Sequence, residues 1–451
     1  MSAIKRSAEN KSADTGKKRY GWIIKTAGFL LFVILIYKLL EFLLVPPTEW
    51  GSFKEIYSGK EKWNTIYLGS SHSYNSIDPN VMDRELSTTS FNLGTSDQAL
   101  DGSLFLLKEA LKYHPVKTVY LEMYFKVWLE GGHAGALHSE RDDEDMTNLW
   151  VILDNTRFSP DKAEYFLNAS SSDYYVPGAL SVRRYWRKLL NLAEIKENVK
   201  NRLEYEEPEE YKGRGYFGSK NKLGKSLAIY GFQDTIEEDM FSGDNYEDLK
   251  ELVKLCKDRD IELILYCSPV NDVYLMNCGY ASYVRQLKEF AEENELCCYD
   301  FNLARKEYLD LEFSDFRDYN HLNTEGAAKF MELLISLRKG EVTAGQVFYG
   351  SYEEKLETED EQIYGINFLP TESFEVMEVK IQSNIKDTGR LRTEIKYVTD
   401  EGEEIRCSDE AGSTDFLVTM PVNEGRVVPG NVDVTVYLDE EKQLHVKQHS
   451  L

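Results

Sequence analysis

The chain has 451 residues, and its 78 Asp and Glu side chains outnumber its 53 Lys and Arg, which gives a formal charge of −25. This excess of negative charge argues against a nucleic-acid-binding protein, because such proteins present a basic face to the phosphates. Hydrophobic residues make up 42% and aromatic residues 12% of the sequence, so the chain can build real cores and is not a disordered protein. Its length predicts two or three domains.

The six cysteines exclude a disulfide-dense scaffold, because they are too few for a chain of this length. None has the paired Cys-x-x-Cys spacing of a zinc site. Cys297 and Cys298 lie in an apolar run and are predicted to be buried free thiols.

Residues 21–45 are predicted to form a transmembrane helix. The stretch is almost entirely apolar from Trp22 onward, and it is long enough to cross the ~30 Å of hydrocarbon in a bilayer. Residues 1–20 form a basic tail, which predicts a cytoplasmic N-terminus and an extracellular bulk domain on a single-pass protein of the cell membrane. A cleaved signal peptide is the alternative, but Val45-Pro46-Pro47 lacks the small residues of a cleavage site. A buried core helix would leave the flanking basic residues unexplained.

Residues 46–344 are predicted to form an α/β domain. Short apolar runs alternate with amphipathic helical segments, which indicates a parallel sheet wrapped by helices. The predicted strands are 65–68, 90–93, 118–123, 262–267 and 297–301, and the predicted helices are 100–113, 246–259, 280–294 and 324–337, the last with Thr324 as its N-cap.

Residues 130–235 interrupt this alternation and are interpreted as an insertion between the third strand and the next helix of the sheet. The segment is rich in tyrosine and includes a helical stretch at 182–201. An insertion at this point follows the carboxyl end of a strand, where open α/β sheets bind ligands. A lid or substrate-binding role and simple structural packing are both open for it.

Residues 345–451 have the pattern of a small β-sandwich-like module. Apolar and polar side chains alternate along 377–382, 391–397 and 432–438, and turn-forming residues separate these runs. A period of two residues predicts antiparallel strands with one buried face.

Two short motifs carry the residue types of nucleophilic catalysis. In Gly69-Ser70-Ser71-His72, the first strand ends in a glycine and two serines, where a hydroxyl at the carboxyl edge of the sheet can attack a carbonyl. In Asp318-Tyr319-Asn320-His321, the spacing can place the carboxylate beside one ring nitrogen while the other nitrogen takes the serine proton. The alternatives are a common Gly-Ser-Ser loop and a surface turn that caps the following helix.

In this order, the two motifs resemble those of the SGNH/GDSL hydrolase superfamily, over about residues 60–340. The resemblance implies a three-layer α/β fold with a parallel central sheet, and a reaction that needs neither a metal nor an organic cofactor. It implies that Ser71 is the nucleophile, that His321 is the general base and that Asp318 orients the histidine. Ser70 is the alternative nucleophile, because the two serines are adjacent.

The resemblance also suggests donors for an oxyanion hole. The glycine of the family's second block maps to Gly94, so the N–H groups of Ser71 and Gly94 are the expected donors. The chain departs from the family in the third block, where Leu121-Glu122-Met123-Tyr124 replaces Gly-x-Asn-Asp. Asn271, after the fourth strand, is the candidate for the missing side-chain donor. Glu122 is interpreted as a hydrogen-bonded carboxylate that steadies the neighbouring loop, and a pocket acid is the alternative.

The same departure, with the Gly-Ser-Ser motif, the late Asp-x-x-His and the N-terminal anchor, is similar to a membrane-anchored subgroup of this superfamily. Its members are the D-alanyl-transfer protein of teichoic-acid synthesis and the SGNH-like O-acetyltransferases of extracellular polysaccharides. The similarity implies a serine esterase or O-acyltransferase that acts on a cell-envelope polysaccharide or teichoic-acid-like acceptor, with a membrane acyl-exporting protein as its partner. A plain carbohydrate esterase and a non-catalytic envelope protein that binds glycan or a partner are the alternatives.

Three further histidines are weaker candidates. His72 follows the nucleophile and is expected to be exposed or to lie behind the reacting groups rather than to line the pocket. His133 and His138 have no neighbouring cysteine, so a metal site between them is not favoured.

Overall fold

The computed structural model describes residues 2–46, 49–129, 147–170, 174–204, 206–223, 228–230, 240–276, 278–371, 373 and 375–449. Side chains are described from Trp22 onward, apart from those of residues 49–52, 129, 147–148 and 230. The chain divides into two compact units. The first comprises residues 1–51 and 170–208, and the second comprises residues 52–169 and 209–451. His133 and His138, the candidates for a metal site, lie outside the described residues.

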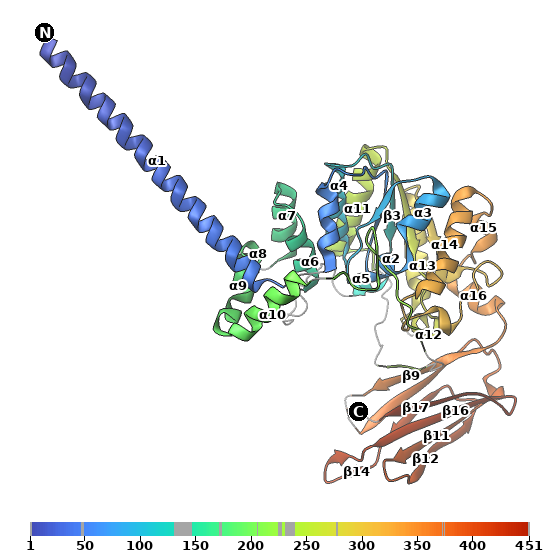
Figure 1. Cartoon of the computed structure of the whole chain (residues 1–451). Coiled ribbons are helices and arrows are strands. Elements are labelled where there is room, and N and C mark those ends of the chain that lie inside the picture. The colour runs from blue at the N-terminus through green and yellow to red at the C-terminus, as the bar shows by residue number, and fades with distance from the viewer. Residues whose placement is uncertain are drawn as a thin grey trace. The chain divides into compact units, whose positions relative to one another are not determined.

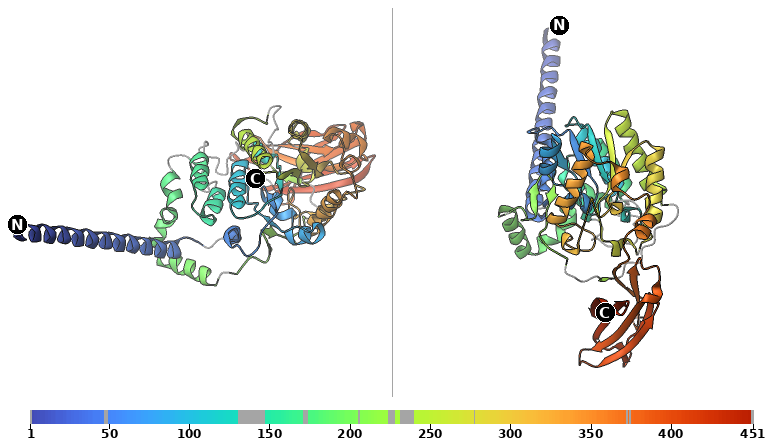
Figure 2. Two further views of the ribbon diagram at one scale, coloured as in Figure 1. Left: turned by 90° about the horizontal axis from the view of Figure 1, so that it is seen from above. Right: turned by 90° about the vertical axis from the view of Figure 1, so that its right-hand side faces the viewer.

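The first unit is built on one long helix, α1 (Ser2–Leu44), which Figures 1 and 2 show as a continuous rod. Its segment Trp22–Leu44 is long and apolar enough to cross a membrane. The large apolar side chains of this segment are exposed, for example Ile24 at 71% and Phe29 at 64%. This exposure excludes the alternative of a buried core helix in a soluble domain.

Among the described residues of the first unit, four further helices follow α1. They are α8 (Tyr175–Ala179), α9 (Ser181–Tyr185), the 3₁₀ helix η3 (Trp186–Leu190) and α10 (Leu192–Leu203). The predicted helical stretch at 182–201 is therefore helical, but it is divided into three helices rather than one. The backbone becomes extended at Asn191, whose side chain accepts the N–H groups of Ala193 and Glu194 and so begins α10 as a new helix.

The second unit contains a parallel sheet in the order β2-β1-β3-β7-β8 (Figure 1). All five predicted strands form, with ends shifted by no more than one residue. The central strands β1, β3 and β7 are buried almost throughout, as expected for a parallel sheet covered on both faces. The strands are β1 (Thr65–Leu68), β2 (Ser90–Asn92), β3 (Thr118–Glu122), β7 (Glu262–Cys267) and β8 (Cys297–Asp300).

Helices cover both faces of this sheet, which confirms the α/β class (Figures 1 and 2). On one face, Tyr67 and Tyr266 of the sheet share a core with Phe330 and Leu334 of α14. On the other face, α11 packs against α4 and, through Tyr246 and Phe290, against α13. The covering helices are α3 (Pro79–Leu86), α4 (Leu100–Leu111), α11 (Gly243–Asp258), α13 (Tyr280–Glu293) and α14 (Thr324–Lys339).

The prediction that Thr324 caps α14 is wrong by one residue. Asn323 is the N-cap, because its side-chain oxygen accepts the N–H groups of Glu325 and Gly326. The remaining short elements of this part are η1 (Glu49–Tyr57), α2 (Ser71–Ser76), α5 (Lys126–Leu129), α6 (Thr147–Asn155), α7 (Pro160–Ala169), α12 (Asp272–Leu275), η4 (Phe301–Leu303) and η5 (Phe313–Asp315).

The predicted insertion at 130–235 contributes to both units. Its described residues include α6 and α7 and the hairpin of β4 (Tyr211–Gly213) with β5 (Tyr216–Phe217) in the second unit, and α8 to α10 in the first. A further strand, β6 (Ala228–Tyr230), pairs in parallel with β9 of the C-terminal sheets.

The C-terminal module has two four-stranded sheets, ordered β13-β10-β9-β6 and β12-β11-β16-β17. The alternating apolar side chains of both sheets meet in one core that includes Val379, Ile395 and Val434, so the predicted antiparallel strands with one buried face are confirmed. The strands are β9 (Ile363–Pro370), β10 (Val376–Ser383), β11 (Leu391–Thr399), β12 (Glu404–Ala411), β13 (Asp415–Thr419), β14 (Val422–Asn423), β15 (Arg426–Val427), β16 (Gly430–Leu438) and β17 (Glu441–His449).

Two short helices, α15 (Ala344–Val347) and α16 (Tyr352–Thr358), lie between the predicted boundary at residue 345 and the first strand. Lys355 of α16 is buried and pairs with Asp272 at 2.8 Å. This pair ties α16 to the segment that follows β7.

None of the six cysteines, all of which the structure describes, forms a disulfide bond. Cys297 and Cys298, which were expected to be buried, are half-buried, because β8 is an edge strand of the parallel sheet.

Candidate active site

The turn after β1 accepts only glycine at position 69. The φ angle of Gly69 is +135°, and a Cβ atom on this residue would lie 2.5 Å from Cβ of Glu122. The next residue, Ser70, caps the short helix α2, and Ser71 is the first residue of that helix. Because β1 lies between β2 and β3 in the sheet, this turn sits at the point where the strand order reverses, which is the usual ligand site of open α/β sheets.

A closed loop presents the second motif. Phe316 and Leu322 pair as an antiparallel bridge, and the N–H of Arg317 donates to the carbonyl of His321 at 3.0 Å. Behind the loop, a Cβ atom on Gly326 would lie 2.3 Å from the carbonyl oxygen of Asp315, so this glycine lets the start of α14 pack closely. The loop therefore holds Asp318 and His321 in a fixed relation to the first turn of α14.

The structure brings Ser71, His321 and Asp318 into one hydrogen-bonded chain. Oγ of Ser71 lies 2.6 Å from Nε2 of His321. Nδ1 of the same ring lies 2.9 Å and 3.0 Å from the two carboxylate oxygens of Asp318. A carboxylate can only accept, so Nδ1 carries the proton, and Nε2 is then the acceptor for the hydroxyl of Ser71. This is the arrangement in which a histidine can remove the serine proton.

The surroundings keep Asp318 ionised and His72 neutral. Burial alone would raise the pKa of Asp318, but the hydrogen bonds from the side chain and N–H of His321 and from the N–H of Asn320 bring its pKa well below the ordinary value. Burial, and then the nearby His321, lower the pKa of His72 well below its ordinary value. The His72 ring stacks on His321 with 4.6 Å between centroids, and His72 is buried rather than exposed.

A second chain of hydrogen bonds closes the site into a ring. Nε of Arg317 donates to Oδ2 of Asp318 at 3.2 Å, and its Nη1 donates to the side-chain oxygen of Asn75 at 3.2 Å. The amide of Asn75 then donates to the carbonyl of Ser71 at 2.8 Å. The nucleophile and the carboxylate are thus linked on both sides, through His321 and through the Arg317–Asn75 pair. The sequence does not point to this pair. The only signal for Arg317 is its position next to Asp318, and the only signal for Asn75 is its place one turn after Ser71.

Glu122 has the role of a loop-steadying carboxyl that was favoured from the sequence. Its Oε2 accepts the hydroxyl of Ser70 at 2.8 Å and the N–H of Ser70 at 3.2 Å. Burial raises the pKa of Glu122 to about 8, although the two hydrogen bonds from Ser70 act in the opposite direction. The group is therefore neutral at neutral pH and places no negative charge beside the nucleophile.

We expect Glu122→Gln to change how stability depends on pH. The folded protein holds the Glu122 proton up to about pH 8, whereas the reference pKa of an exposed Glu is 4.5. Folding therefore takes up a proton between these values, and the free energy of unfolding of the wild type falls as the pH rises through this window. The free energy of unfolding of the variant, relative to that of the wild type, should increase with pH by at most ~1.4 kcal/mol per pH unit. The difference should become constant above the pKa of Glu122 in the folded protein.

Chemical denaturation from about pH 5 to pH 9 measures this difference. Glu332→Gln is the matched control, because Glu332 is an exposed residue of α14, and it should leave the pH profile unchanged. A constant difference between Glu122→Gln and the wild type across the range would contradict the assignment.

Two of the predicted oxyanion donors, Gly94 and Asn271, already take part in other hydrogen bonds. Gly94 lies against the nucleophile turn, since a Cβ atom there would be 3.1 Å from the carbonyl oxygen of Ser70. Its N–H already donates to the side-chain oxygen of Asn92 at 3.0 Å, so it can serve an oxyanion only by sharing or exchanging that bond. The N–H of Asn271 donates to the carbonyl of Tyr319, in the loop that holds Asp318 and His321, and the side-chain oxygen of Asn271 caps α12. The roles of Ser71, Gly94 and Asn271 as donors stay predictions.

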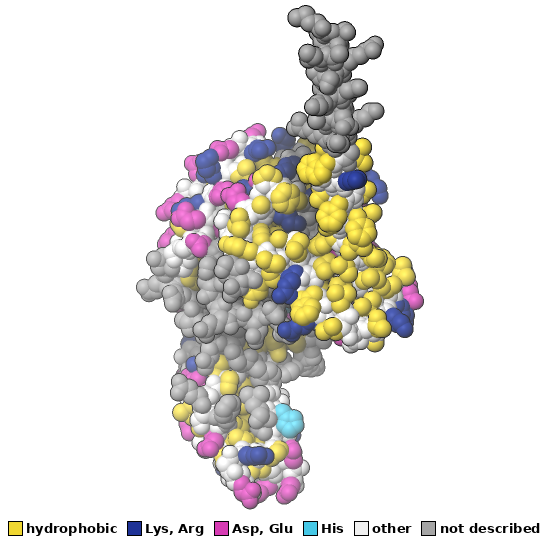
Figure 3. Space-filling view, turned by 90° about the vertical axis from the view of Figure 1, so that its left-hand side faces the viewer, with side chains coloured by type: hydrophobic (Ala, Val, Ile, Leu, Met, Phe, Trp, Pro, Cys, Tyr) yellow, Lys and Arg dark blue, Asp and Glu magenta, His cyan; other side chains and the backbone are white. Residues whose placement is uncertain are grey.

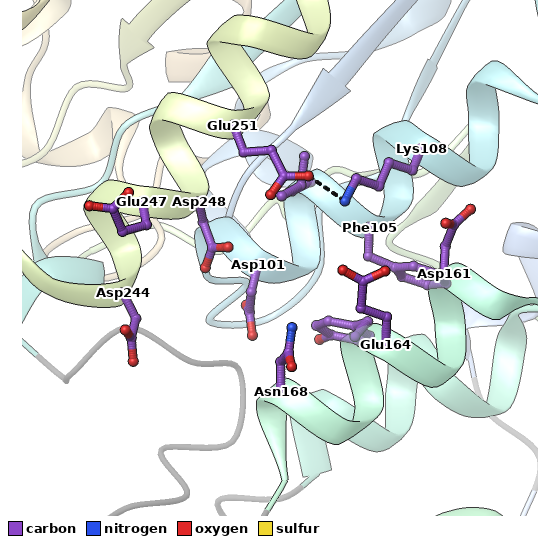
Figure 4. Close-up of a pocket in the computed structure, with 12 residues that line it drawn as sticks. Asp101, Phe105, Lys108, Asp161, Glu164, Asn168, Asp244, Glu247, Asp248 and Glu251 are labelled. Atoms are coloured by element: carbon purple, nitrogen blue, oxygen red, sulfur yellow. Dashed lines mark ion pairs between the residues drawn. The ribbon is translucent and has the colours of Figure 1, made fainter.

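Two cavities of the second unit lie apart from the hydrogen-bonded chain of Ser71, His321 and Asp318, in that none of these three residues lines them. One, of about 310 Å³, lies between α4, α7 and α11, and carboxylates dominate its lining (Figure 4). Its Lys108 pairs with Glu251 at 2.6 Å. The other, of about 510 Å³, includes Asn271 and Lys355 in its wall.

Neither the family models nor the curated proteins that were compared with this chain give a match.

Proposed function

We propose that this chain is a membrane-anchored serine esterase or O-acyltransferase that works through an acyl-enzyme at Ser71. The observation that supports the proposal most strongly is the hydrogen-bonded chain in which Ser71 Oγ lies 2.6 Å from His321 Nε2 and His321 Nδ1 lies 2.9 Å from Asp318. Such a chain of hydroxyl, imidazole and carboxylate activates a serine for attack on a carbonyl.

The proposed reaction has two steps, acylation of Ser71 and transfer of the acyl group to the acceptor. In the first, Oγ of Ser71 bonds to the acyl carbon while its proton passes to Nε2 of His321, which then protonates the departing group of the donor. In the second, a hydroxyl of the acceptor gives its proton to His321 and bonds to the acyl carbon. The bond between Oγ of Ser71 and the acyl carbon then breaks, and His321 returns the proton to Oγ, which restores the free hydroxyl. Asp318 stabilises the imidazolium in both steps.

The acceptor is proposed to be a polysaccharide or teichoic-acid-like polymer of the cell envelope. The apolar segment Trp22–Leu44 is long enough to anchor the protein in the membrane, and the basic residues before it favour a cytoplasmic N-terminus and an extracellular catalytic domain. An anchored enzyme meets acyl donors where they cross the membrane, so a membrane acyl-exporting protein is the proposed partner. Water in place of the polymer hydroxyl would make the same site an esterase.

The test compares the ester content of envelope polymers by mass spectrometry in cells with and without this protein. We expect the ester content to fall when the protein is absent, and to be restored by the wild-type chain but not by Ser71→Ala. The Ser71→Ala chain must reach the wild-type level in the membrane for the comparison to count. A rise in ester content on deletion would identify a hydrolase, and full restoration by Ser71→Ala would favour a non-catalytic envelope protein.

A further inference from the structure

The segment from Tyr174 to Ala193 has a composition unlike the rest of the chain. It contains four basic residues and no acidic one, although the whole chain carries a formal charge of −25. The four are Arg183, Arg184, Arg187 and Lys188. This local reversal of charge favours contact with an anionic surface.

The same segment exposes large apolar side chains. Leu190 is 81% exposed, Leu192 is 73% exposed and Val176 is 57% exposed. We define the interface patch as these three residues together with four other exposed apolar side chains, namely Tyr175, Leu180, Trp186 and Leu189. Figure 3 shows hydrophobic side chains gathered on this face of the molecule, with Lys and Arg side chains among them.

Hydrogen bonds fix the helices of the patch to the C-terminal end of the apolar segment of α1. Ser181 accepts from the hydroxyl of Tyr37 at 3.1 Å and donates to Glu41 at 3.0 Å. The amide of Asn198 donates to the carbonyl of Leu43 at 2.9 Å and to that of Val45 at 3.1 Å. On the α1 side, these hydrogen bonds involve Tyr37, Glu41, Leu43 and, directly after the helix, Val45. The helices of the patch are therefore attached where α1 leaves its apolar stretch.

Basic and aromatic side chains interleave within the segment. The guanidinium of Arg183 lies 5.5 Å from the ring centroid of Trp186, and Nζ of Lys188 lies 5.1 Å from the ring centroid of Tyr185. Trp, Tyr, Lys and Arg are the residues that gather where hydrocarbon gives way to headgroups. Helices that lie in this boundary combine an apolar face with a basic one.

We propose that the interface patch lies in the surface of the bilayer, with its apolar side chains at the base of the headgroups and its basic side chains on anionic lipid phosphates. The inference rests on the proposed anchoring by α1. Lipid is the occupant because the patch is attached to the end of the exposed apolar helix that the bilayer would surround. The protein would thereby contact the membrane through the span and through this second element, which would fix how the first unit is oriented on the membrane.

Depth-dependent fluorescence quenching in proteoliposomes tests this proposal. The full chain is purified with one added cysteine at a time, labelled with an environment-sensitive fluorophore, and reconstituted in vesicles with brominated acyl chains. Leu190→Cys reports on the patch, Leu31→Cys reports on the span, and Leu417→Cys is the control, because Leu417 is an exposed leucine of β13 at 72%. The chain without an added cysteine gives the background from the native thiols.

We expect quenching at positions 31 and 190 to be several-fold stronger than at position 417, in the absence of any other protein. Quenching at 31 but not at 190 would overturn the patch while leaving the anchor intact, and quenching at neither would show that the anchoring itself is wrong. Equal quenching at 190 and 417 would also overturn the proposal, because the patch would then contact the lipid no more than β13 does. None of these outcomes depends on catalytic activity.

A second arm tests the lipid charge. Quenching at position 190 should increase when phosphatidylglycerol is added to phosphatidylcholine vesicles, and Arg187→Gln combined with Lys188→Gln should remove that increase. An increase that survives the double substitution would overturn the role of these basic side chains. Quenching that appears only when a partner protein is added would show that the patch binds protein rather than lipid.

Discussion

Replacing Ser71 with alanine is expected to lower the turnover of a small activated ester by ~10⁴-fold or more, because removal of a triad member leaves only the residual catalysis of the site. Oγ of Ser71 is the hydroxyl that lies 2.6 Å from Nε2 of His321. The alanine variant should also lose covalent labelling by a fluorophosphonate probe. Turnover and labelling are measured on the folded protein, with a denaturation curve to show that the variant is as stable as the wild type.

Ser70→Ala is the matched control, since it removes the same atom from the adjacent residue. The hydroxyl of Ser70 donates to Glu122 at 2.8 Å and lies 3.2 Å from Nδ1 of His72, so it takes part in holding the turn rather than in the proton transfer. We expect a milder loss of turnover and retained labelling in this variant. A dead Ser70→Ala and an active Ser71→Ala would assign the nucleophile to Ser70.

The features that the sequence predicted well are those set by residues close together in the chain. The central strands β1 and β7 are largely apolar runs, and their burial on both faces follows from that composition. The Asp-x-x-His spacing fixes the contact of Asp318 with His321, because both residues lie in one closed loop. Spacing alone does not predict the contact of Ser71 with His321, because 250 residues separate them. That prediction came from the order of the two motifs, which resembles the order in a superfamily whose layout is known.

The features that the sequence missed depend on partners distant in the chain. Arg317 and Asn75 form a hydrogen bond only because the fold brings α2 next to the loop that holds Asp318 and His321. The strand β6 is three residues long and is defined by its pairing with β9, to which no local pattern points. The break at Asn191 is a local capping event inside a sequence of good helix formers, where the asparagine side chain competes successfully with the helix.

Asp318→Asn is the second variant with a large expected effect, with a loss of turnover of about 10⁴-fold when the analogous substitution forces the wrong tautomer. The side chain of Asp318 accepts from four donors: the N–H groups of Asn320 and His321, Nδ1 of the His321 ring and Nε of Arg317. An asparagine has only one acceptor oxygen, and the two backbone N–H groups both point at Oδ1. The new amide NH₂ would then take the place of Oδ2, facing Arg317 and the ring nitrogen.

That placement turns two hydrogen bonds into contacts between donors. Arg317 cannot give up its proton, and Nδ1 lies 3.0 Å from the position of Oδ2 and 2.9 Å from Oδ1. The new amide therefore favours the tautomer in which the proton of His321 moves from Nδ1 to Nε2, against the hydrogen bond that the remaining oxygen can still accept. An Nε2 that carries a proton cannot accept one from Ser71, and the nucleophile is no longer activated. The turnover number should therefore fall while the Michaelis constant for a small ester changes little, since Asp318 contacts the ring nitrogen of His321 that lies opposite Ser71.

Asp360→Asn is the control for the lost negative charge, because Asp360 is exposed in the segment before β9, and it should keep wild-type turnover. The measurement is the full dependence of turnover on ester concentration for the three proteins. If Asp318→Asn kept the turnover of the wild type, the carboxylate would have no part in setting the tautomer of His321. The hydrogen-bonded ring through Arg317 and Asn75 would then be a packing device, and a Ser–His pair alone would carry the reaction.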